Sequence, residues 1–280
     1  MTATVLFDAP GPKAQRRIRV LTVLSSVAIV ALIAYAIYLF GANGQLAPDK
    51  WDEFTQWPII RFLLGGLGHT LLAASVAAAI ALPLGLLLAL ARLSTLKPLH
   101  WLGVTLVEFF RSIPLLLLIY IFFIALPKYG INPDLFWKLV IPIGLCSGAT
   151  IAEVFRAGVL ALPKGQSEAA EAIGMTRAQT FRYVVFPQAV RLVLPSLLAQ
   201  VVILLKDTTL GYVVSYSELQ FSAKVLVSST GNLIQTYLVV TVVYILVNLA
   251  ISRTAELWSR RQERRYLKAG QGLPLEATTQ

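Results

Sequence analysis

The sequence predicts an all-α, polytopic membrane protein, built as a bundle of about six transmembrane helices. Three observations support this fold class. Of the 280 residues, 57% are hydrophobic and only 14% are charged, whereas soluble domains carry about 25% charged residues. Several uncharged runs are long enough to cross a hydrocarbon core about 30 Å thick. Lys and Arg collect in alternate connecting segments, as the positive-inside rule requires.

Charge-free runs locate three of the spans. Val20 to Phe40 is apolar or small throughout, Phe62 to Ala91 contains only His69 as an ionisable group, and Leu233 to Ser252 carries no charge. Each run is long enough to cross a bilayer. The first run exceeds the roughly 7 to 15 apolar residues of a signal-peptide core, so we expect a retained helix over residues 20–41.

Three further spans contain charged residues, which brings the expected number of transmembrane helices to six. A charge at the centre of a span costs about 2.5–3.5 kcal/mol on insertion scales, so these residues are functional candidates. The interrupted spans, each with its two charged residues, are Trp101–Pro127 with Glu108 and Arg111, Leu139–Leu162 with Glu153 and Arg156, and Arg191–Ser217 with Lys206 and Asp207.

The distribution of Lys and Arg predicts the orientation of the chain. With the N-terminus inside, the cytoplasmic segments 13–19, 92–97, 164–191 and 253–268 hold sixteen Lys and Arg residues, and the external segments hold five. This bias satisfies the positive-inside rule. We therefore expect a cytoplasmic tail over residues 1–19, a transmembrane domain over residues 20–252 and a basic cytoplasmic tail over residues 253–280.

Motifs of catalysis and metal binding are absent from the sequence. It contains no G-x-x-x-x-G-K-[ST] phosphate loop and no H-E-x-x-H pair, and His69 and His100 fall on opposite sides of the membrane in the expected topology. The single Cys146 cannot form an internal disulfide. We expect no bound cofactor, no metal and no catalysis. The net charge of +10 comes from residues that flank spans, which favours anionic membrane lipids over nucleic acid as partners.

A polar segment over residues 163–187 separates the fourth and fifth spans and should lie in the cytoplasm. Ser167 can cap a helix with Glu168 in its first turn. Gly174 should end that helix, and Thr176 can cap the next one. A short helix with small residues on one face fits a groove in another protein. The same pattern suits an ordinary interfacial helix, and the residues alone leave both explanations open.

The polar segment closely resembles the ATPase-docking loop of bacterial ABC importer permeases. Glu168, Ala169, Ala170, Gly174 and Pro187 stand where that motif has E-A-A, G and P. Apolar Val184 and Phe186 replace its usual Ile and Leu. Over residues 65–252 the chain is similar to the polar amino acid branch of the family, through Gly68-His-Thr70-Leu-Leu, Glu108-Phe-Phe-Arg111-Ser-Ile-Pro114-Leu, Ala152-Glu153-Val-Phe-Arg156-Ala-Gly158, Leu162-Pro-Lys-Gly165-Gln166 and Leu205-Lys206-Asp207-Thr208-Thr209-Leu210.

The resemblance implies a type I ABC importer permease fold with a cytoplasmic coupling helix, in a bacterial cell membrane and with both termini in the cytoplasm. Two permeases, expected to be different chains rather than two copies, would each dock residues 163–187 on an ATPase subunit that uses ATP and Mg. An extracellular solute-binding protein would deliver the substrate. Actinobacterial glutamate permease subunits are the most similar, so we expect glutamate or another acidic amino acid. Permeases for basic amino acids, glutamine or cystine, and ion-coupled secondary transporters, are the alternatives.

Two of the charged pairs have a structural explanation. Glu108 and Arg111 are three residues apart, as are Glu153 and Arg156, so each pair can form an ion pair along its own helix. Both pairs should lie near the cytoplasmic face. We therefore expect them to brace the docking region.

The remaining charges belong to the expected substrate pathway. Lys206 and Asp207 could form an ion pair with each other, pair with the partner permease or contact the substrate, and the sequence leaves these explanations open. The carboxylates of an acidic amino acid need cations and hydroxyl donors. The residues expected to supply them along the pathway are Arg111, Lys206, Asp207, Thr208 and Thr209.

Overall fold

The structure is a computed structural model that describes the backbone of residues 11–270 and the side chains of residues 11–254, 256 and 257. Residues 1–10 and 271–280 of the two expected tails lie outside this range. The described chain is helical and contains no strand, which confirms the all-α fold class. The chain divides into two units, Met1–Trp57 and Pro58–Gln280, which are considered separately.

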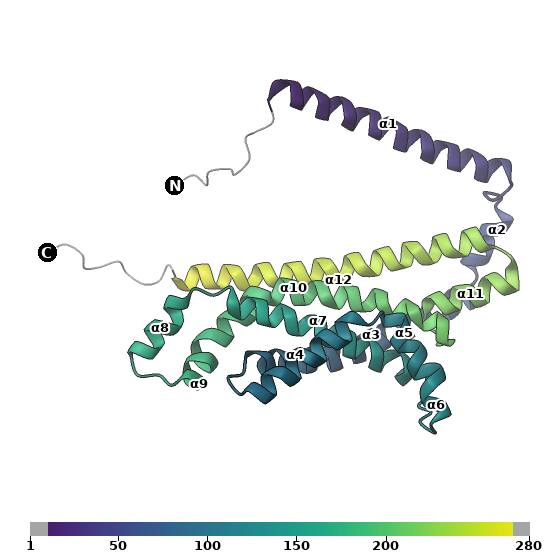
Figure 1. Cartoon of the computed structure of the whole chain (residues 1–280). Helices are drawn as coiled ribbons and strands as arrows, with labels where there is room; N and C mark the ends of the chain where they lie inside the picture. Colours follow the sequence, from purple (N-terminus) through teal and green to yellow (C-terminus); the bar gives the residue numbers. More distant parts are fainter. Residues whose placement is uncertain (1–10, 271–280) are drawn as a thin grey trace. The chain divides into compact units, whose positions relative to one another are not determined.

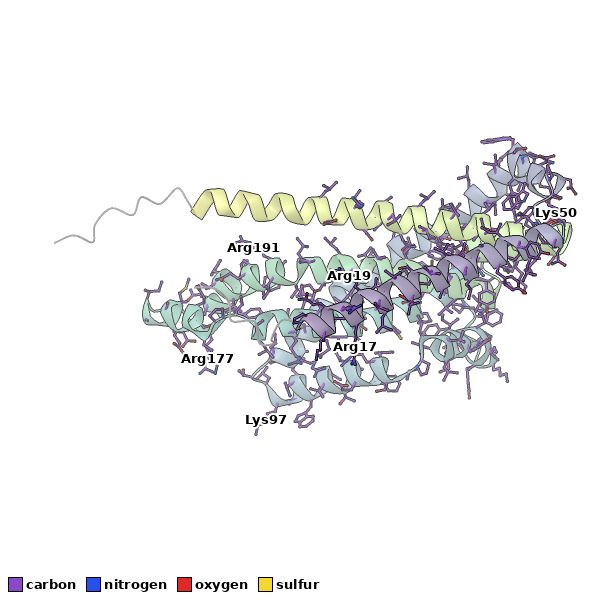
Figure 2. The ribbon with its side chains drawn as sticks, turned by 90° about the horizontal axis from the view of Figure 1, so that it is seen from above. Arg17, Arg19, Lys50, Lys97, Arg177 and Arg191 are labelled. Atoms are coloured by element: carbon purple, nitrogen blue, oxygen red, sulfur yellow. The ribbon has the colours of Figure 1, made fainter. Side chains whose placement is uncertain are left out.

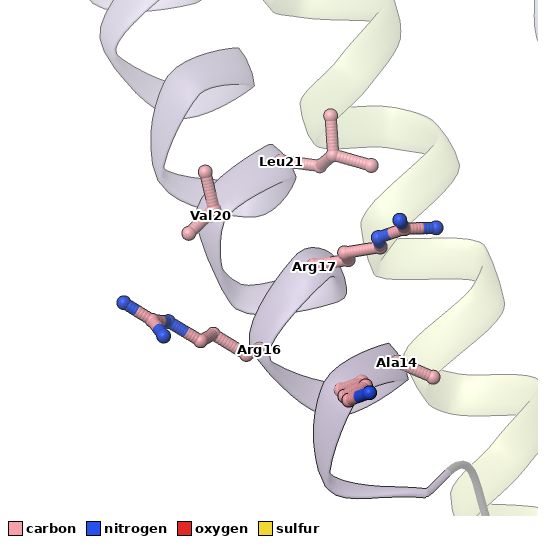
Figure 3. A pocket seen from close by; sticks show the side chains of 6 residues that line it. Ala14, Arg16, Arg17, Val20 and Leu21 are labelled. Carbon is pink, nitrogen blue, oxygen red and sulfur yellow. The ribbon is translucent and has the colours of Figure 1, made fainter.

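The first unit consists of one long helix and a short helical connection. Helix α1 (Pro12–Ala42) begins eight residues before the expected span, and none of its residues is buried. Figure 3 shows Arg16 and Arg17 extending from opposite sides of its first turns, beside Val20 and Leu21. A helix that is apolar all round and unpacked within its unit suits a lipid surrounding. Helix α2 (Asp49–Asp52) and η1 (Glu53–Thr55) follow.

The second unit contains the remaining helices (Figure 1). In chain order they are α3 (Trp57–Leu93), α4 (Lys97–Ser112), α5 (Leu115–Tyr120), the π-helical turn η2 (Ile121–Ala125), α6 (Leu126–Lys128), α7 (Leu135–Leu160), α8 (Lys164–Ala172), α9 (Arg177–Thr180), the π-helical turn η3 (Phe181–Val185), α10 (Phe186–Asp207), the 3₁₀ turn η4 (Thr208–Val214), α11 (Leu219–Thr230) and α12 (Leu233–Gly270).

The number of possible spans agrees with a polytopic bundle. Five described helices are long and apolar enough to cross a membrane, and α4 together with α5–α6 makes a sixth if that bent pair counts as one span. In Figure 1, α8 and α9 lie at one end of the second unit, and α6 and α11 lie at the other. The polar segment is thus separated from α6 and α11 by the length of the second unit.

Helix α7 forms the centre of the second unit because small residues let its neighbours approach closely. A Cβ added at Gly148 would lie 2.9 Å from Cδ2 of Leu84 in α3. A Cβ at Gly85 of α3 would in turn lie 2.5 Å from Cγ2 of Ile151. Ala77 of α3 has no exposed surface. Close contact through small residues is how membrane helices gain packing energy where no hydrophobic effect drives them together.

The third expected span is not one straight helix. Helices α4 and α5–α6 meet at an angle of 94°, across Ile113 and Pro114. Both residues have extended backbone, with ψ of 126° at each. Pro114 has no N–H to continue the helix and disfavours helical geometry at Ile113. Residues 101–127 therefore make a span that is broken at Pro114, a proline that is expected to kink or loosen a helix.

The fifth and sixth spans also differ from their expected bounds. Helix α10 begins at Phe186 and ends at Asp207, where the 3₁₀ turn η4 takes over. The chain then turns through Ser215, which has φ of +59°, before α11 begins. A hydrophobic run shows that a segment is buried or in lipid, but not whether its helix is continuous. Helix α12 continues past the expected end at Ser252 as far as Gly270.

Candidate coupling surface and charged network

The polar segment forms a short exposed helix at one end of the second unit. Of the residues in α8, only Ala170 is buried, while Glu168 and Ala169 are exposed. The helix begins at Lys164, with Pro163 before it, so Ser167 lies inside the helix and does not cap it. Pro163 is the residue before the helix, with φ of −59° and ψ of 129°, a position at which a backbone N–H has no partner in the helix to lose.

Gly174 makes the turn that follows α8. Its φ is +88°, a conformation that residues with a Cβ rarely adopt, and no atom lies within 4 Å of the place a Cβ would take. Its N–H donates to the carbonyl of Glu171 at 2.9 Å, and the N–H of Met175 donates to the carbonyl of Ala170 at 3.2 Å. These bonds satisfy the last carbonyls of the helix, as in other glycine C-caps.

A capping box starts the next helix, as Thr176 was expected to do. Oγ1 of Thr176 accepts a hydrogen bond from the N–H of Gln179 at 3.4 Å, and the side chain of Gln179 accepts one from the N–H of Thr176 at 2.9 Å. This reciprocal arrangement satisfies two backbone donors. The segment therefore has a defined backbone at both ends of the turn between α8 and α9.

The segment is tied back to the bundle at Pro187 and its neighbour. Pro187 lies at the start of α10, directly after the π-helical turn η3, and has no N–H to donate to the preceding turn. The amide of Gln188 donates to the carbonyl of Val184 at 2.9 Å and to Oε1 of Gln166 in α8 at 3.4 Å. The exposed helix is thus joined to α10 by a direct polar contact as well as by the chain.

Basic side chains gather at the same end of the second unit. Figure 2 shows Lys97, Arg177 and Arg191 toward the end that carries α8 and α9. The exposed surface of α8 therefore lies toward the same end of the second unit as these three basic residues.

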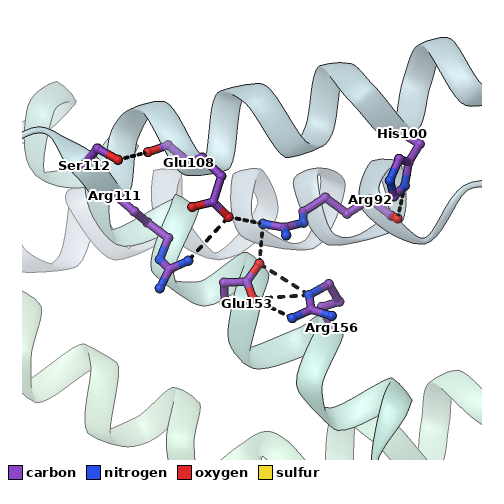
Figure 4. A network of polar contacts seen from close by, with 7 residues as sticks. All are labelled: Arg92, His100, Glu108, Arg111, Ser112, Glu153 and Arg156. Carbon is purple, nitrogen blue, oxygen red and sulfur yellow. Dashed lines mark hydrogen bonds and ion pairs between the residues drawn. The ribbon is translucent and has the colours of Figure 1, made fainter.

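The charged residues of the third and fourth spans form one network (Figure 4). Arg111 lies 3.7 Å from Glu108 in α4, and Arg156 lies 2.9 Å from Glu153 in α7, so both expected pairs form. Arg92, at the end of α3, was not expected to take part. Its guanidinium contacts Oε1 of Glu108 at 3.1 Å and also forms an ion pair with Oε1 of Glu153. Three helices therefore meet through five charged side chains.

The expected substrate-pathway residues do not form one cluster. Arg111 is 42% exposed and pairs with Glu108. Lys206 is exposed and Asp207 is partly buried, and within the described chain no ion pair joins them to each other or to Arg111. The explanation of Lys206 and Asp207 as a self-neutralising pair is wrong, because adjacent helical residues point about 100° apart.

The two threonines of the expected pathway use their hydroxyls locally. Thr208 donates to the carbonyl of Leu205, and Thr209 donates to the carbonyl of Lys206, each at 2.7 Å. Thr208 is fully buried and Thr209 is partly buried. These bonds stabilise the end of α10, where backbone carbonyls lose their helical partners.

A second polar cluster, which the sequence did not indicate, lies beside α11. The carboxylate of Glu218 is fully buried and accepts hydrogen bonds from the N–H groups of Gln220 at 2.8 Å and Phe221 at 2.6 Å. The hydroxyl of Tyr244 in α12 donates to it at 2.9 Å. Thr70 accepts from the N–H of Leu219 at 3.1 Å. The motif at residues 68–72 was the available signal, but nothing in the sequence paired it with residues 218–219.

Glu218 has an unusual proton affinity for a carboxylic acid. It lies between the candidate spans that end at Val214 and begin at Leu233. Burial raises its pKa to about 7, against the opposing effect of the hydrogen bonds from Gln220, Phe221 and Tyr244. Desolvation penalises the charged form, while hydrogen bonds to the carboxylate favour it.

The described part of the chain contains no group of three or more His, Cys, Asp or Glu side chains that could hold a metal ion.

The chain is similar to proteins of one transport family. The family described as binding-protein-dependent transport system inner membrane component matches residues 81–264. The glutamate transport system permease protein of Corynebacterium glutamicum is 36% identical over 229 residues, which are 80% of this chain and 83% of that protein. A probable glutamine ABC transporter permease protein of Bacillus subtilis is also 36% identical, over 77% of this chain and 97% of that protein. An L-cystine permease protein of the same organism is 33% identical over 217 residues, 76% of this chain and 92% of that protein.

Solved structures show the same architecture. The crystal structure of an amino acid ABC transporter with histidines matches with a TM-score of 0.70 and 31% identity, covering 72% of this chain and 94% of the other. A chain of a bacterial ABC transporter that imports the polysaccharide alginate matches with a TM-score of 0.58 and 15% identity, over 89% of this chain and 99% of that one. The second match shows a shared fold alone.

Proposed function

This chain belongs to the family of binding-protein-dependent transport system inner membrane components and is an amino acid permease of the ABC importer class, and from that membership we propose that it imports an acidic amino acid, with glutamate as the first candidate. The import is driven by ATPase subunits that dock on residues 163–187. The permease itself makes and breaks no covalent bond.

The exposed helix α8 with its glycine turn is the observation that carries the docking proposal. Glu168, Ala169 and Gly174 are exposed, while Ala170 faces inward and joins the helix to the bundle. A rigid, small-faced helix at the end of a membrane bundle can enter a groove of a partner with little loss of conformational entropy. The capping box and the Gln188–Gln166 contact supply that rigidity.

The partners follow from the same proposal. A second permease completes the translocation path, and we favour a different chain over a second copy. A solute-binding protein outside the cell delivers the amino acid, and the docking end with both termini lies in the cytoplasm, as the bias of Lys and Arg supports. ATP and Mg belong to the ATPase subunits.

Glutamate is proposed because one relative is a glutamate transport system permease protein. Other relatives are named for glutamine and cystine, so these amino acids are the alternatives to test. Arg111, Lys206, Asp207, Thr208 and Thr209 are the proposed pathway residues. Lys206 and Asp207 support this role because each carries a charge with no ion pair in the described residues, and such charges within a membrane protein are functional by default.

Uptake and ATP hydrolysis in proteoliposomes test the proposal. The complete importer, with its ATPases and binding protein, is supplied with labelled L-glutamate, L-glutamine or L-cystine. We expect Gly174→Leu, which strains the turn, and Glu168→Lys, which reverses a charge on α8, to abolish uptake while the permease remains in the membrane. The control is Gly130→Leu, because Gly130 has φ of +80° and open space around it but lies outside α8 and α9.

Three outcomes contradict the proposal in different ways. Normal uptake by both α8 variants would reject docking at this segment. Uptake that continues after ATP is removed would favour an ion-coupled transporter. Stimulation of ATP hydrolysis by glutamine or cystine, and not by glutamate, would change the substrate and leave the docking intact.

A further inference from the structure

Arg92 is the residue of the charged network that links three helices, and nothing in the preceding proposal uses it. It is the next-to-last residue of α3, and its side chain is only 12% exposed. One guanidinium nitrogen, Nη1, reaches both Glu108 of α4 and Glu153 of α7. In Figure 4 it lies between the two carboxylates, with Arg111 and Arg156 on their outer sides.

The backbone of Arg92 also contacts α4, through His100 and Gly103. The imidazole of His100 in α4 lies 2.6 Å from the carbonyl oxygen of Arg92. A Cβ added at Gly103 of α4 would lie 2.9 Å from the backbone nitrogen of Arg92. The end of α3 is therefore fitted against α4, and the guanidinium extends from this joined pair toward α7.

Charge neutralisation does not require Arg92. Glu108 keeps Arg111 on its own helix, and Glu153 keeps Arg156 on its own helix. Pairs within one helix stabilise that helix, but they do not determine where one helix lies relative to another. The contacts of Arg92 with Glu108 and Glu153 join different helices, whereas Arg111 and Arg156 each pair with a carboxylate on their own helix.

Helix α7 connects this network to the proposed docking segment. Glu153 lies in the last two turns of α7, which ends at Leu160, and α8 begins at Lys164. A displacement of α8 is thus passed along one short connection to the helix that carries Glu153. Both contacts use the same nitrogen, Nη1, at the end of a planar guanidinium, so the two carboxylates are held at one point between the helices.

We propose that Arg92 is a positioning residue that keeps the α3–α4 pair aligned with α7, so that movement imposed on α8 changes the transmembrane bundle as a unit. The proposal rests on the docking of ATPases at α8. When Arg92 is replaced by a neutral residue, only the apolar packing joins α7 to α3 and α4, and their ends follow the movement of α7 less closely. ATP is then hydrolysed with less amino acid transported.

The test compares Arg92→Gln with Arg92→Lys and the control Lys97→Gln in proteoliposomes. Lys97 is an exposed basic residue at the start of α4, and no ion pair to it occurs in the described chain. The readout is labelled L-glutamate taken up per ATP hydrolysed, together with the amount and melting temperature of the complex. If glutamate does not stimulate hydrolysis, the amino acid that does so is used.

We expect Arg92→Gln to assemble normally and to hydrolyse ATP at the basal rate, while uptake per ATP falls by about 2- to 30-fold, the range of known coupling effects. Arg92→Lys should be intermediate, because it keeps the positive charge but replaces the planar guanidinium with a strongly hydrated ammonium on a flexible stem. The Lys97→Gln control should match the wild type. Adding Glu153→Gln to Arg92→Gln should cause little further loss, since the contact is already broken.

An unchanged ratio of uptake to hydrolysis in Arg92→Gln overturns the proposal. Failure of both Arg92 variants to assemble also overturns it, because Arg92 would then be needed for folding. Gly174→Leu in the same liposomes separates the two proposals. If that variant loses uptake while Arg92→Gln is normal, only the role of Arg92 is rejected, and normal uptake by Gly174→Leu rejects docking itself.

Discussion

The hydroxyl of Thr70 in α3 accepts a hydrogen bond at 3.1 Å from the backbone N–H of Leu219, which lies 149 residues later in the chain. The same hydroxyl donates to the carbonyl of Gly66 at 3.1 Å. Thr70 and Leu219 are both fully buried. A single side chain thus joins α3 to the start of α11 where no water can replace it.

Replacing Thr70 by Val should destabilise the protein by about 1–3 kcal/mol, because the N–H of Leu219 would remain buried without a partner. Thr70→Ser keeps the hydroxyl and should retain most of the stability. Melting of the purified permease in detergent measures both. Thr105→Val is the control, since Thr105 is exposed on α4. Equal melting temperatures for Thr70→Val and the control would show that the bond contributes nothing.

Tyr244→Phe should also destabilise the protein, because it removes the hydrogen bond that the phenol donates to Glu218. At pH 8, where Glu218 is charged, the cost should be about 1.5–3 kcal/mol. The effect should almost vanish in a Glu218→Gln background, because the two changes remove the same interaction. Tyr237→Phe on the same helix is the control, since Tyr237 makes no side-chain hydrogen bond to the described residues. Additive effects of the two changes would contradict the contact.

The raised pKa of Glu218 predicts how stability depends on pH. Burial moves it from 4.5 to about 7, so the native state holds a proton that the unfolded state releases between these values. This contribution is fully present below about pH 4.5 and is lost as pH rises through 7, with a total of about 3 kcal/mol. Melting should therefore fall from pH 5 to pH 8 in the wild type and less steeply in Glu218→Gln. Parallel pH profiles would exclude Glu218 as the source.

Gly158→Ala should destabilise the contact between α7 and α10. The added Cβ would overlap Cγ1 of Val193 and lie 3.3 Å from the carbonyl oxygen of Ala189. Overpacking of this kind costs about 1–3 kcal/mol. Val193→Ala removes the overlapping carbon, so the double variant should melt above Gly158→Ala alone. Gly165→Ala is the control, because no atom lies within 4 Å of its added Cβ. A double variant less stable than either single change would contradict this packing.

The composition of the chain was enough to predict the fold class, because apolar length and the distribution of Lys and Arg are local properties of each span. The short exposed helix α8 and the turn after it were also predictable, since the glycine turn and the Thr176 cap depend on neighbouring residues. The error at Ser167 arose because Pro163 can start a helix as well as stop one. Sequence patterns locate helices better than they locate the first residue of each helix.

Contacts between distant segments could not be predicted from one sequence. Arg92 was counted as a basic residue of a cytoplasmic connection, and its two carboxylate partners were assigned to arginines on their own helices. Glu218 lies in a short polar stretch that looked like the end of a span. In both cases the packing of the helices determines which residue lies next to the charged side chain. The local pattern of residues does not indicate that neighbour. The bend at Pro114 was signalled by the proline, but its size depends on what α4 packs against.

The π-helical turn η3, over Phe181–Val185, stands between the capped helix α9 and the start of α10. A π-helical turn contains more residues than an α-helical one, and each residue of an α-helix corresponds to about 100° of rotation. The direction in which α8 faces, seen down the axis of α10, is therefore set by the number of residues in this turn as much as by their identity. Deleting one residue from η3 would rotate α9 relative to α10 by roughly a quarter of a circle, while every side chain on α8 stayed the same.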